Sequence, residues 1–222
     1  MLEKSELLGQ FNPANHPDFV LIEKQSNEET KHYLRKEAAQ AWEGMHQKAN
    51  EEGVDLKIVS STRNFERQKQ IWENKWLGRS LTQNVNLAQS GLNDFEKAET
   101  ILKYSAMPGT SRHHWGTDID INSVEEDFFE TEEGEKMYLW LINNAHTFGF
   151  FQPYTMKGKN RPTGYEEEPW HWSYAPLSNV FLKEYLASIS YSDIHGFEGA
   201  ETAKHLEVIE HFVCGIASHS TF

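Results

Sequence analysis

The stretch at residues 111–121, SRHHWGTDIDI, places two adjacent histidines and two alternating aspartates within a few positions. Imidazole nitrogens and carboxylate oxygens are common metal ligands in proteins. Because side chains alternate along a strand, Asp118 and Asp120 are expected to share one face, where two carboxylates repel each other unless a cation or a hydrogen-bond network compensates them. The stretch therefore indicates a metal site, and it leaves open whether His113 or His114 belongs to it.

A second candidate ligand lies in residues 166–174, EEEPWHWSY. On a strand, His171 would face away from the two tryptophans beside it, and Glu168, three residues earlier, would fall on the opposite face. Pro169 favours a strand start or a bulge, and a kink there would swing Glu168 back beside His171. Alone, such a histidine is more often satisfied by a neighbouring group, so a metal role depends on the first motif.

The two stretches together contain the groups of a hydrolytic zinc site. Two histidines and one carboxylate with an open fourth position are the usual ligands of a catalytic zinc. A further carboxylate beside the zinc-activated water would be the general base.

A third stretch, SSTRNFERQ at residues 60–68, adds an arginine and a glutamine. Arg63 stands where a predicted strand passes into a helix, a position from which a guanidinium can bind a carboxylate or an oxyanion. Gln68 lies on the first turns of that helix. Without the other two stretches, Arg63 would be taken for a surface residue.

The elements that position these residues predict an α+β fold, with a small central antiparallel sheet flanked by helices and extra C-terminal helices. Strands are expected over 56–61, 115–121 and 170–175. Apolar spacing and stop signals predict helices over 29–51, 64–78, 92–104 and 135–148. We expect one domain over residues 1–222, with a core of motifs at about 55–175 and a helical extension at about 177–222.

The composition favours a folded domain and argues against nucleic-acid binding. The chain has 222 residues, 21 of them basic and 34 acidic, and its net charge of −13 disfavours phosphate-rich partners. No apolar run is long enough to span a membrane. The start, MLEKSELLGQF, lacks the apolar segment of a signal peptide, which leaves a cytoplasmic location open. The single cysteine, Cys214, excludes an internal disulfide and is expected to be a buried small hydrophobe.

Three spaced patterns occur in order along the chain. They are SxxRxxxxQ at Ser60, Arg63 and Gln68, SxHxxGxxxD at Ser111, His113, Gly116 and Asp120, and ExWH at Glu168, Trp170 and His171. In this order and rough spacing they resemble the zinc D-alanyl-D-alanine carboxypeptidases and dipeptidases of the VanY type. The resemblance covers roughly residues 55–175, and the three motifs in order make it specific.

The resemblance implies a zinc peptidase with an α+β fold. It implies that the enzyme hydrolyses the C-terminal D-Ala, or a similar D-residue, of bacterial cell-wall peptides, usually outside the cytoplasmic membrane. By position it implies the zinc ligands His113, Asp120 and His171, the general base Glu168, the oxyanion stabiliser Arg63, and the cleft residues Ser111 and Gln68.

Two departures from the family pattern bear on substrate choice. Asp118 stands where the family commonly has a small apolar residue, so it is either a partner of a metal ligand or a subsite for a cation on the substrate. Ser61 and Thr62 stand where the family often has Gly-Tyr, which would reshape a subsite. Related endopeptidases often carry Asp at the position of Glu168, so this residue favours a carboxypeptidase.

Alternative functions share the same ligands. One is a zinc-binding module that recognises the peptidoglycan peptide without hydrolysing it. Others are a peptidoglycan endopeptidase or a dipeptidase of the same chemistry, including a cytoplasmic dipeptidase. The sequence leaves open the D,D- or L,D-configuration of the cleaved bond and the oligomeric state.

Overall fold

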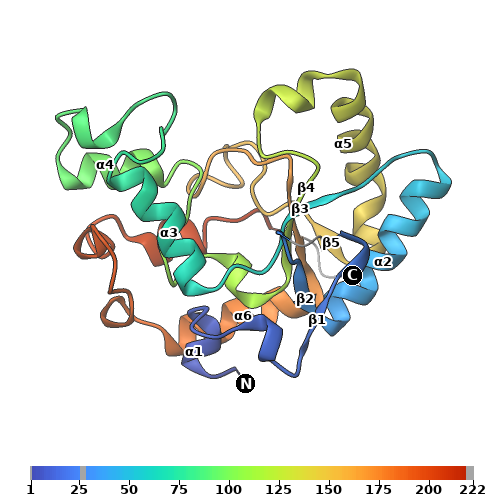
Figure 1. The fold of residues 1–222 in the computed structure, drawn as a ribbon, viewed down its shortest axis with the longest axis horizontal. Coiled ribbons are helices and arrows are strands. Elements are labelled where there is room, and N and C mark those ends of the chain that lie inside the picture. Colours follow the sequence, from blue (N-terminus) through green and yellow to red (C-terminus); the bar gives the residue numbers. More distant parts are fainter. Residues whose placement is uncertain (1, 26–28, 219–222) are drawn as a thin grey trace.

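The computed structural model describes residues 2–25 and 29–218, arranged around a central antiparallel sheet (Figure 1). The strand order of this sheet is β3-β4-β6-β5. Its strands are β3 (Ile58–Ser60), β4 (Asp118–Ile121), β5 (Phe150–Phe151) and β6 (His171–Tyr174). Two further strands, β1 (Phe19–Leu21) and β2 (Tyr33–Arg35), form a separate antiparallel pair. The predicted α+β fold with a small antiparallel sheet is confirmed.

Helices flank the sheet on three sides in the view of Figure 1. In Figure 1, α2 and α5 lie to the right of the sheet, α3 and α4 to its left, and α1 and α6 below. Their bounds are α1 Lys4–Leu7, α2 Lys36–Glu51, α3 Phe65–Trp76, α4 Asp94–Ile101, α5 Glu132–Asn144 and α6 Ala175–Ser188. Short 3-10 turns occupy Pro13–Asn15, Glu23–Gln25, Leu87–Gln89, Arg112–Trp115, Glu126–Glu130, Ala145–Phe148, Tyr191–Asp193 and Ala200–Thr202, and a π turn occupies Ile209–Val213. Within the described ranges, no helix has the length and hydropathy needed to cross a bilayer.

The alternation of β4 separates an apolar face from a polar face, as the sequence predicted. Ile119 and Ile121 are fully buried in an apolar cluster that also contains Trp172 and residues of α2 and α5. The side chains of Asp118 and Asp120 therefore point to the opposite side of the sheet. The apolar face packs into the core, and the polar face is available for a functional site.

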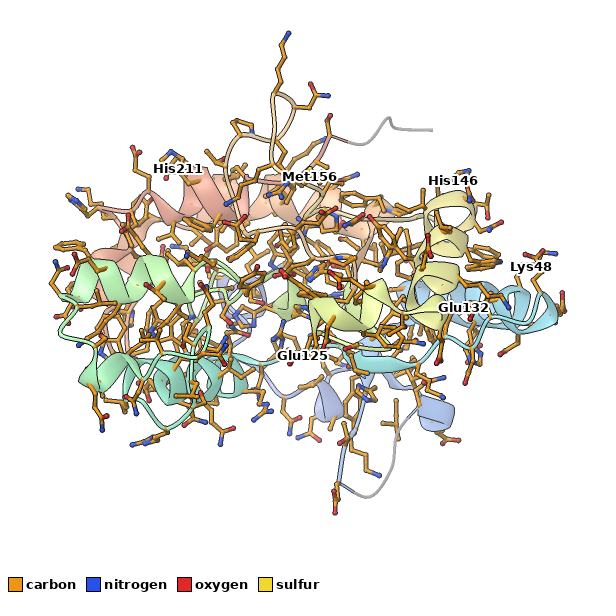
Figure 2. All side chains as sticks on the ribbon, turned by 90° about the horizontal axis from the view of Figure 1, so that it is seen from above. Lys48, Glu125, Glu132, His146, Met156 and His211 are labelled. Atoms are coloured by element: carbon orange, nitrogen blue, oxygen red, sulfur yellow. The ribbon has the colours of Figure 1, made fainter. Side chains whose placement is uncertain are left out.

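A second apolar cluster lies on the other side of the molecule, between α3, α4, α6 and the chain that follows α6. Trp72 and Tyr185 are fully buried in it, together with Val208 and Val213 from the C-terminal segment. The segment after α6 thus contributes to the core. Side chains fill the space between the helices, strands and turns (Figure 2).

Two helix boundaries differ from the predicted ones for identifiable reasons. The helix expected over 29–51 begins only at Lys36, because Tyr33–Arg35 pair with Phe19–Leu21 instead. The helix expected over 135–148 begins earlier, at Glu132, where the Thr131 side chain accepts a hydrogen bond from the backbone N–H of Gly134. Helix capping and strand pairing decided these boundaries more strongly than apolar spacing.

The C-terminal extension contains less regular helix than predicted. After α6 the described chain forms only short turns, and Gly196, Gly199 and Glu207 have positive φ angles that interrupt a helix. Cys214 is partly exposed, so the expectation of a buried small hydrophobe is wrong. Residues 219–222 of the predicted extension lie outside the described residues.

Candidate metal centre

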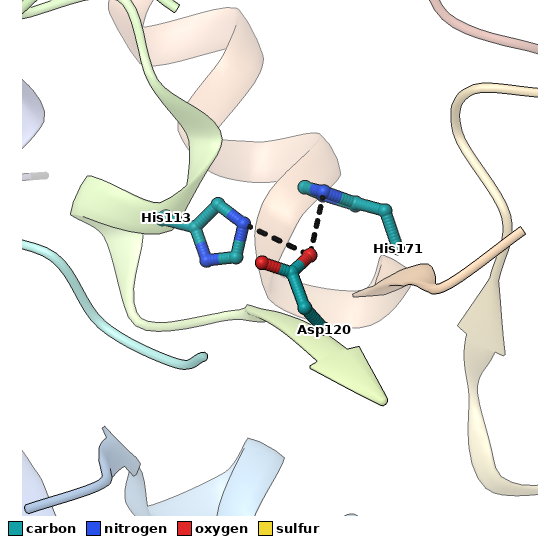
Figure 3. Close-up of side chains that lie close together, drawn as sticks. All are labelled: His113, Asp120 and His171. Carbon is teal, nitrogen blue, oxygen red and sulfur yellow. Dashed lines mark ion pairs between the residues drawn. The ribbon is translucent and has the colours of Figure 1, made fainter. Parts of the chain in front are cut away.

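Three side chains predicted as ligands meet in one buried cluster (Figure 3). Nε2 of His113 lies 3.4 Å from Oδ1 of Asp120, and Nδ1 of His171 lies 3.3 Å from the same oxygen. Asp120 and His171 are direct partners in the β4–β6 ladder, while His113 comes from the 3-10 turn Arg112–Trp115 before β4. No more than 4% of any of the three residues is exposed.

Hydrogen bonds fix which nitrogen of each imidazole faces the cluster. Nδ1 of His113 lies 2.8 Å from the Ser61 carbonyl oxygen, which only accepts, so Nδ1 carries the proton. Nε2 of His171 lies 2.9 Å from Oδ2 of Asp118 and donates to this carboxylate. His113 therefore turns the lone pair of Nε2 towards Asp120, and His171 turns that of Nδ1 towards the same residue.

This donor set fits a metal ion. Among the described residues, His113 Nε2 and Asp120 Oδ1 are buried atoms without a hydrogen-bond partner. Burial alone would raise the pKa of Asp120, but the neighbouring His113 and His171 hold it well below its usual range. An anionic oxygen and two nitrogen lone pairs that face one another in a buried space require a cation. Two histidines and one carboxylate are ligands typical of zinc.

Glu168 lies beside this cluster, as expected if the chain bends at Pro169. The chain turns before β6, with the His171 backbone N–H donating to the Glu168 carbonyl. Oε2 of Glu168 comes within 3.2 Å of Nδ1 of His171. Burial raises the pKa of Glu168 above its usual value, against the lowering effect of His171. A carboxylate with a raised pKa is suited to accept and return a proton near neutral pH.

Arg63 reaches the cluster from the segment between β3 and α3. Its backbone N–H donates to the His113 carbonyl, and its Nη2 lies 3.9 Å from Oδ2 of Asp120. The next residue, Asn64, caps α3 by accepting a hydrogen bond from the Arg67 backbone. The strand-to-helix junction therefore places the guanidinium where the sequence predicted.

His114, the alternative ligand of the first motif, points away from the cluster. It is fully buried, its Nε2 accepts a hydrogen bond from the Gly109 backbone N–H, and its Nδ1 lies 2.6 Å from the Arg63 carbonyl oxygen. Both ring nitrogens are thus engaged in the neutral form, and burial lowers the pKa of His114 to about 3. Two histidines outside the motifs, His146 and His211, lie far apart from each other in the view of Figure 2.

The cluster opens into a cleft of about 820 Å³. The residues that line the cleft include Arg63, Ser111, His113, Asp120, Glu168 and His171. Ser111 thus lines the cleft, as expected. The other two residues expected to contact substrate do not line the cleft: Gln68 donates to the Ala106 carbonyl behind the wall, and Asp118 is fully buried beneath His171. Of the two roles considered for Asp118, its position matches the partner of a ligand.

Several residues around the cluster were not identified from sequence. Arg112 is buried and pairs with Asp118, at 3.1 Å between Nε and Oδ2. The ring of Tyr154 lies 4.7 Å from that of His171 and lines the cleft. The need to neutralise Asp118 was a usable signal for Arg112, because a buried carboxylate requires a compensating cation. The sequence held no comparable signal for Tyr154.

A second group with metal-ligand residue types lies at the N-terminal part of the chain. It consists of Glu6, His16 and Asp18. Arg35 forms ion pairs with Glu6 at 3.0 Å and with Asp18 at 3.3 Å. A guanidinium therefore already supplies the positive charge there.

Comparison with known proteins gives a consistent family assignment. A family model described as VanY, D-alanyl-D-alanine carboxypeptidase, matches residues 31–177. A putative carboxypeptidase of Bacillus subtilis is 33% identical over 177 residues, which cover 76% of this chain and 56% of that protein. This chain thus spans little more than half the length of that relative.

Two solved structures share the fold. The LD-carboxypeptidase LdcB has a TM-score of 0.56 and 29% identity, with 82% of this chain and 81% of that chain covered. A vancomycin-resistance D,D-pentapeptidase in complex with Zn(II) has a TM-score of 0.52 and 26% identity, with 75% of this chain and 89% of that chain covered.

Proposed function

Because this chain belongs to the VanY family of D-alanyl-D-alanine carboxypeptidases, we propose that it is a zinc peptidase that removes a C-terminal D-Ala, or a similar D-residue, from bacterial cell-wall peptides. One observation carries the proposal. The lone pairs of His113 Nε2 and His171 Nδ1 converge on Oδ1 of Asp120, at 3.4 Å and 3.3 Å, and Glu168 lies beside them.

His113, Asp120 and His171 would hold the zinc ion. When bound, zinc polarises a substrate carbonyl and lowers the pKa of a water molecule to about 7. The Zn(II) complex of the related pentapeptidase supports the choice of this metal.

Glu168 and Arg63 would carry the protein's own part of the reaction. Glu168 accepts the proton of the attacking water and then donates it to the leaving amine, which its burial and raised pKa support. The Arg63 guanidinium lies on the cleft wall near Asp120 and would stabilise the oxyanion that develops on the substrate carbonyl. Ser111 lines the same cleft and would contact the substrate.

The charges of the cleft suit a peptide that ends in a carboxylate. Arg63 and Lys75 line one wall, and Glu125, Glu126 and Asp127 line the cleft as well. A short peptide with a terminal carboxylate and an amino group matches this division of charge. Since peptidoglycan lies outside the cytoplasmic membrane, we expect the protein to act there.

Two substitutions at Glu168 test the proposed mechanism. Zinc content and hydrolysis of peptides ending in D-Ala-D-Ala are compared between the wild type, Glu168→Ala and Glu168→Gln. Tight zinc binding with turnover reduced by about 10²–10⁴-fold supports Glu168 as the base. Full activity in either variant would contradict this role, and peptide binding without any hydrolysis by the wild type would identify a recognition module instead.

The likeness to the LD-carboxypeptidase favours a second candidate substrate. An L,D-carboxypeptidase would remove the D-Ala of a tetrapeptide that lacks the D,D-bond. The same proteins incubated with that tetrapeptide distinguish the two activities.

A further inference from the structure

We propose that Arg112 and Asp118 are positioning residues that act as one unit to hold His171 ready for metal binding. The inference rests on the proposed metal site and concerns residues outside its ligands. Asp118 supplies the hydrogen-bond acceptor for His171, and Arg112 supplies the charge that allows a carboxylate to stay buried there.

The Asp118 carboxylate is saturated with hydrogen-bond donors. Its Oδ2 accepts from His171 Nε2 at 2.9 Å and from Arg112 Nε at 3.1 Å. Its Oδ1 accepts from the hydroxyls of Thr117 at 2.6 Å and Ser173 at 2.9 Å. An ionised carboxylate has about four lone-pair sites, and four donors fill them here. Asp118 therefore has no capacity left for a cation on the substrate.

Arg112 neutralises this buried carboxylate and ties it to the neighbouring strand. Its Nη2 donates to the Ser173 hydroxyl at 2.7 Å, and its guanidinium lies 4.9 Å from the centre of the Trp115 ring. Only 1% of Arg112 is exposed. Removing one partner of a buried ion pair leaves an uncompensated charge in the interior. It therefore destabilises the protein more than replacing both partners by apolar residues.

The unit connects the same three elements that carry the proposed ligands. Arg112 precedes His113 in the 3-10 turn, Asp118 stands two residues before Asp120 on β4, and Ser173 stands two residues after His171 on β6. Asp118 and Ser173 are direct partners in the ladder, as Asp120 and His171 are. The Asp118–Ser173 pair thus lies two residues along the same ladder from the Asp120–His171 pair, and Arg112 bonds to both of its members.

The position of this network explains how His171 is oriented. A hydrogen bond from Nε2 to a carboxylate fixes both the tautomer and the rotation of the ring, and so directs the Nδ1 lone pair towards Asp120. A small apolar residue at position 118, which the family pattern commonly has, would leave Nε2 without this acceptor. Such partners typically change metal affinity by 10–100-fold.

The decisive experiment measures the zinc dissociation constant by competition with a chromophoric chelator. Asp118→Asn keeps the volume of the side chain and removes its charge, and we expect zinc binding 10–100-fold weaker than in the wild type. Ser178→Ala is the matched control, because Ser178 is fully buried and bonds to Ser173 without contacting His171. We expect it to bind zinc like the wild type.

Arg112→Met and the double variant Arg112→Met/Asp118→Ala test the coupling. Arg112→Met leaves the buried Asp118 carboxylate without its counter-charge, so we expect a lower free energy of unfolding than in the double variant. If Arg112→Met cannot be purified, its soluble yield, compared with that of the double variant, gives the same ranking. The double variant should fold and bind zinc no more weakly than Asp118→Asn. NMR detection of the imidazole protons in the metal-free proteins adds an independent readout, since the hydrogen-bonded His171 Nε2–H should be observed in the wild type and should exchange with water in the double variant.

Two outcomes would overturn the proposal in distinguishable ways. If wild type binds zinc and Asp118→Asn binds it equally well, or Ser178→Ala weakens binding as much as Asp118→Asn, the positioning role is wrong while the metal site stands. If wild type binds no zinc, the proposed function fails together with this inference.

Discussion

Asp120 and His171 face each other directly across the β4–β6 ladder, with 3.3 Å between Oδ1 and Nδ1. The two residues are far apart in the sequence and are brought together by strand pairing. The register of the sheet therefore determines whether these two ligands meet. A slip of one residue would turn one of the two strands so that its apolar side chains faced the cleft. The buried Ile119 and Ile121 oppose such a slip, because they would leave the apolar cluster.

Zinc should stabilise the folded protein measurably. The electron-rich ligand atoms repel one another without a cation, and an ion that binds only the native state adds stability by mass action. At zinc concentrations about 100-fold above the dissociation constant we expect a gain of about 2.7 kcal/mol in the free energy of unfolding. Thermal melts with zinc and with chelator measure this gain, and His113→Ala should abolish it. Identical melts of the wild type under both conditions would rule out a native zinc site.

Arg63→Ala should lower turnover while the metal stays bound. Loss of one group that stabilises an oxyanion typically reduces kcat by about 10²–10³-fold. Arg67→Ala is the matched control, because Arg67 lies on the exposed side of α3 and bonds to Gln70. Steady-state kinetics with zinc-saturated proteins provide the test, and equal kcat values for Arg63→Ala and Arg67→Ala would exclude a role for Arg63 in the reaction.

Stability should fall in acid because of His114. Its pKa is about 3 in the folded protein, against 6.5 for the unperturbed group. Between these values the unfolded chain binds a proton that the folded chain does not, so the free energy of unfolding decreases as the pH falls from 6.5 towards 3. The loss should reach about 2 kcal/mol at pH 5.

Denaturant unfolding of the metal-free wild type and of His114→Gln, measured from pH 7 to pH 5, isolates this effect. Glutamine retains an acceptor for the Gly109 N–H and does not titrate. The wild type should therefore lose more stability than the variant over this range. Parallel losses in the two proteins would show that His114 does not cause the acid sensitivity.

Gly116→Ala should destabilise the turn that leads into β4. Gly116 has a φ of +73°, and a Cβ atom there would lie 2.3 Å from Cε1 of Phe19. A left-handed backbone conformation alone costs a residue other than glycine about 1–3 kcal/mol. Gly158→Ala is the control, since a Cβ there would meet nothing within 4 Å. Denaturant unfolding compares the two variants, and equal stabilities would contradict a strict need for glycine at position 116.

Much of the site followed from local patterns in the sequence. Alternation on β4 correctly separated Ile119 and Ile121 from the two aspartates, because side-chain direction in a strand follows from residue parity alone. Pro169 correctly indicated a turn that brings Glu168 to His171. The choice between His113 and His114 could not be made in this way, since it depends on the Gly109 and Ser61 backbone groups that hold each ring.

Contacts between distant segments account for the errors. The pairing of β1 with β2 shortened the first long helix, although its apolar spacing extended further. Gln68 was expected to line the cleft, but its side-chain amide donates to the Ala106 carbonyl and it is not among the lining residues, so its contact with substrate stays a prediction. Arg112 could have been suspected as a counter-charge for Asp118, but its contacts with Asp118 and Ser173 depend on how the turn before β4 packs against the sheet. Such relationships are set by tertiary packing, which spacing along the chain does not encode.

Digestion of a panel of muropeptides by the zinc-loaded protein, followed by mass spectrometry, is the most direct test of zinc-dependent carboxypeptidase activity. The panel contains pentapeptides ending in D-Ala-D-Ala, tetrapeptides, and cross-linked or glycan-attached forms. We expect the wild type to release one C-terminal D-Ala, chelator to stop the release, and Glu168→Ala to release none. A panel that stays intact, or that is cut only at internal bonds, would contradict a zinc carboxypeptidase.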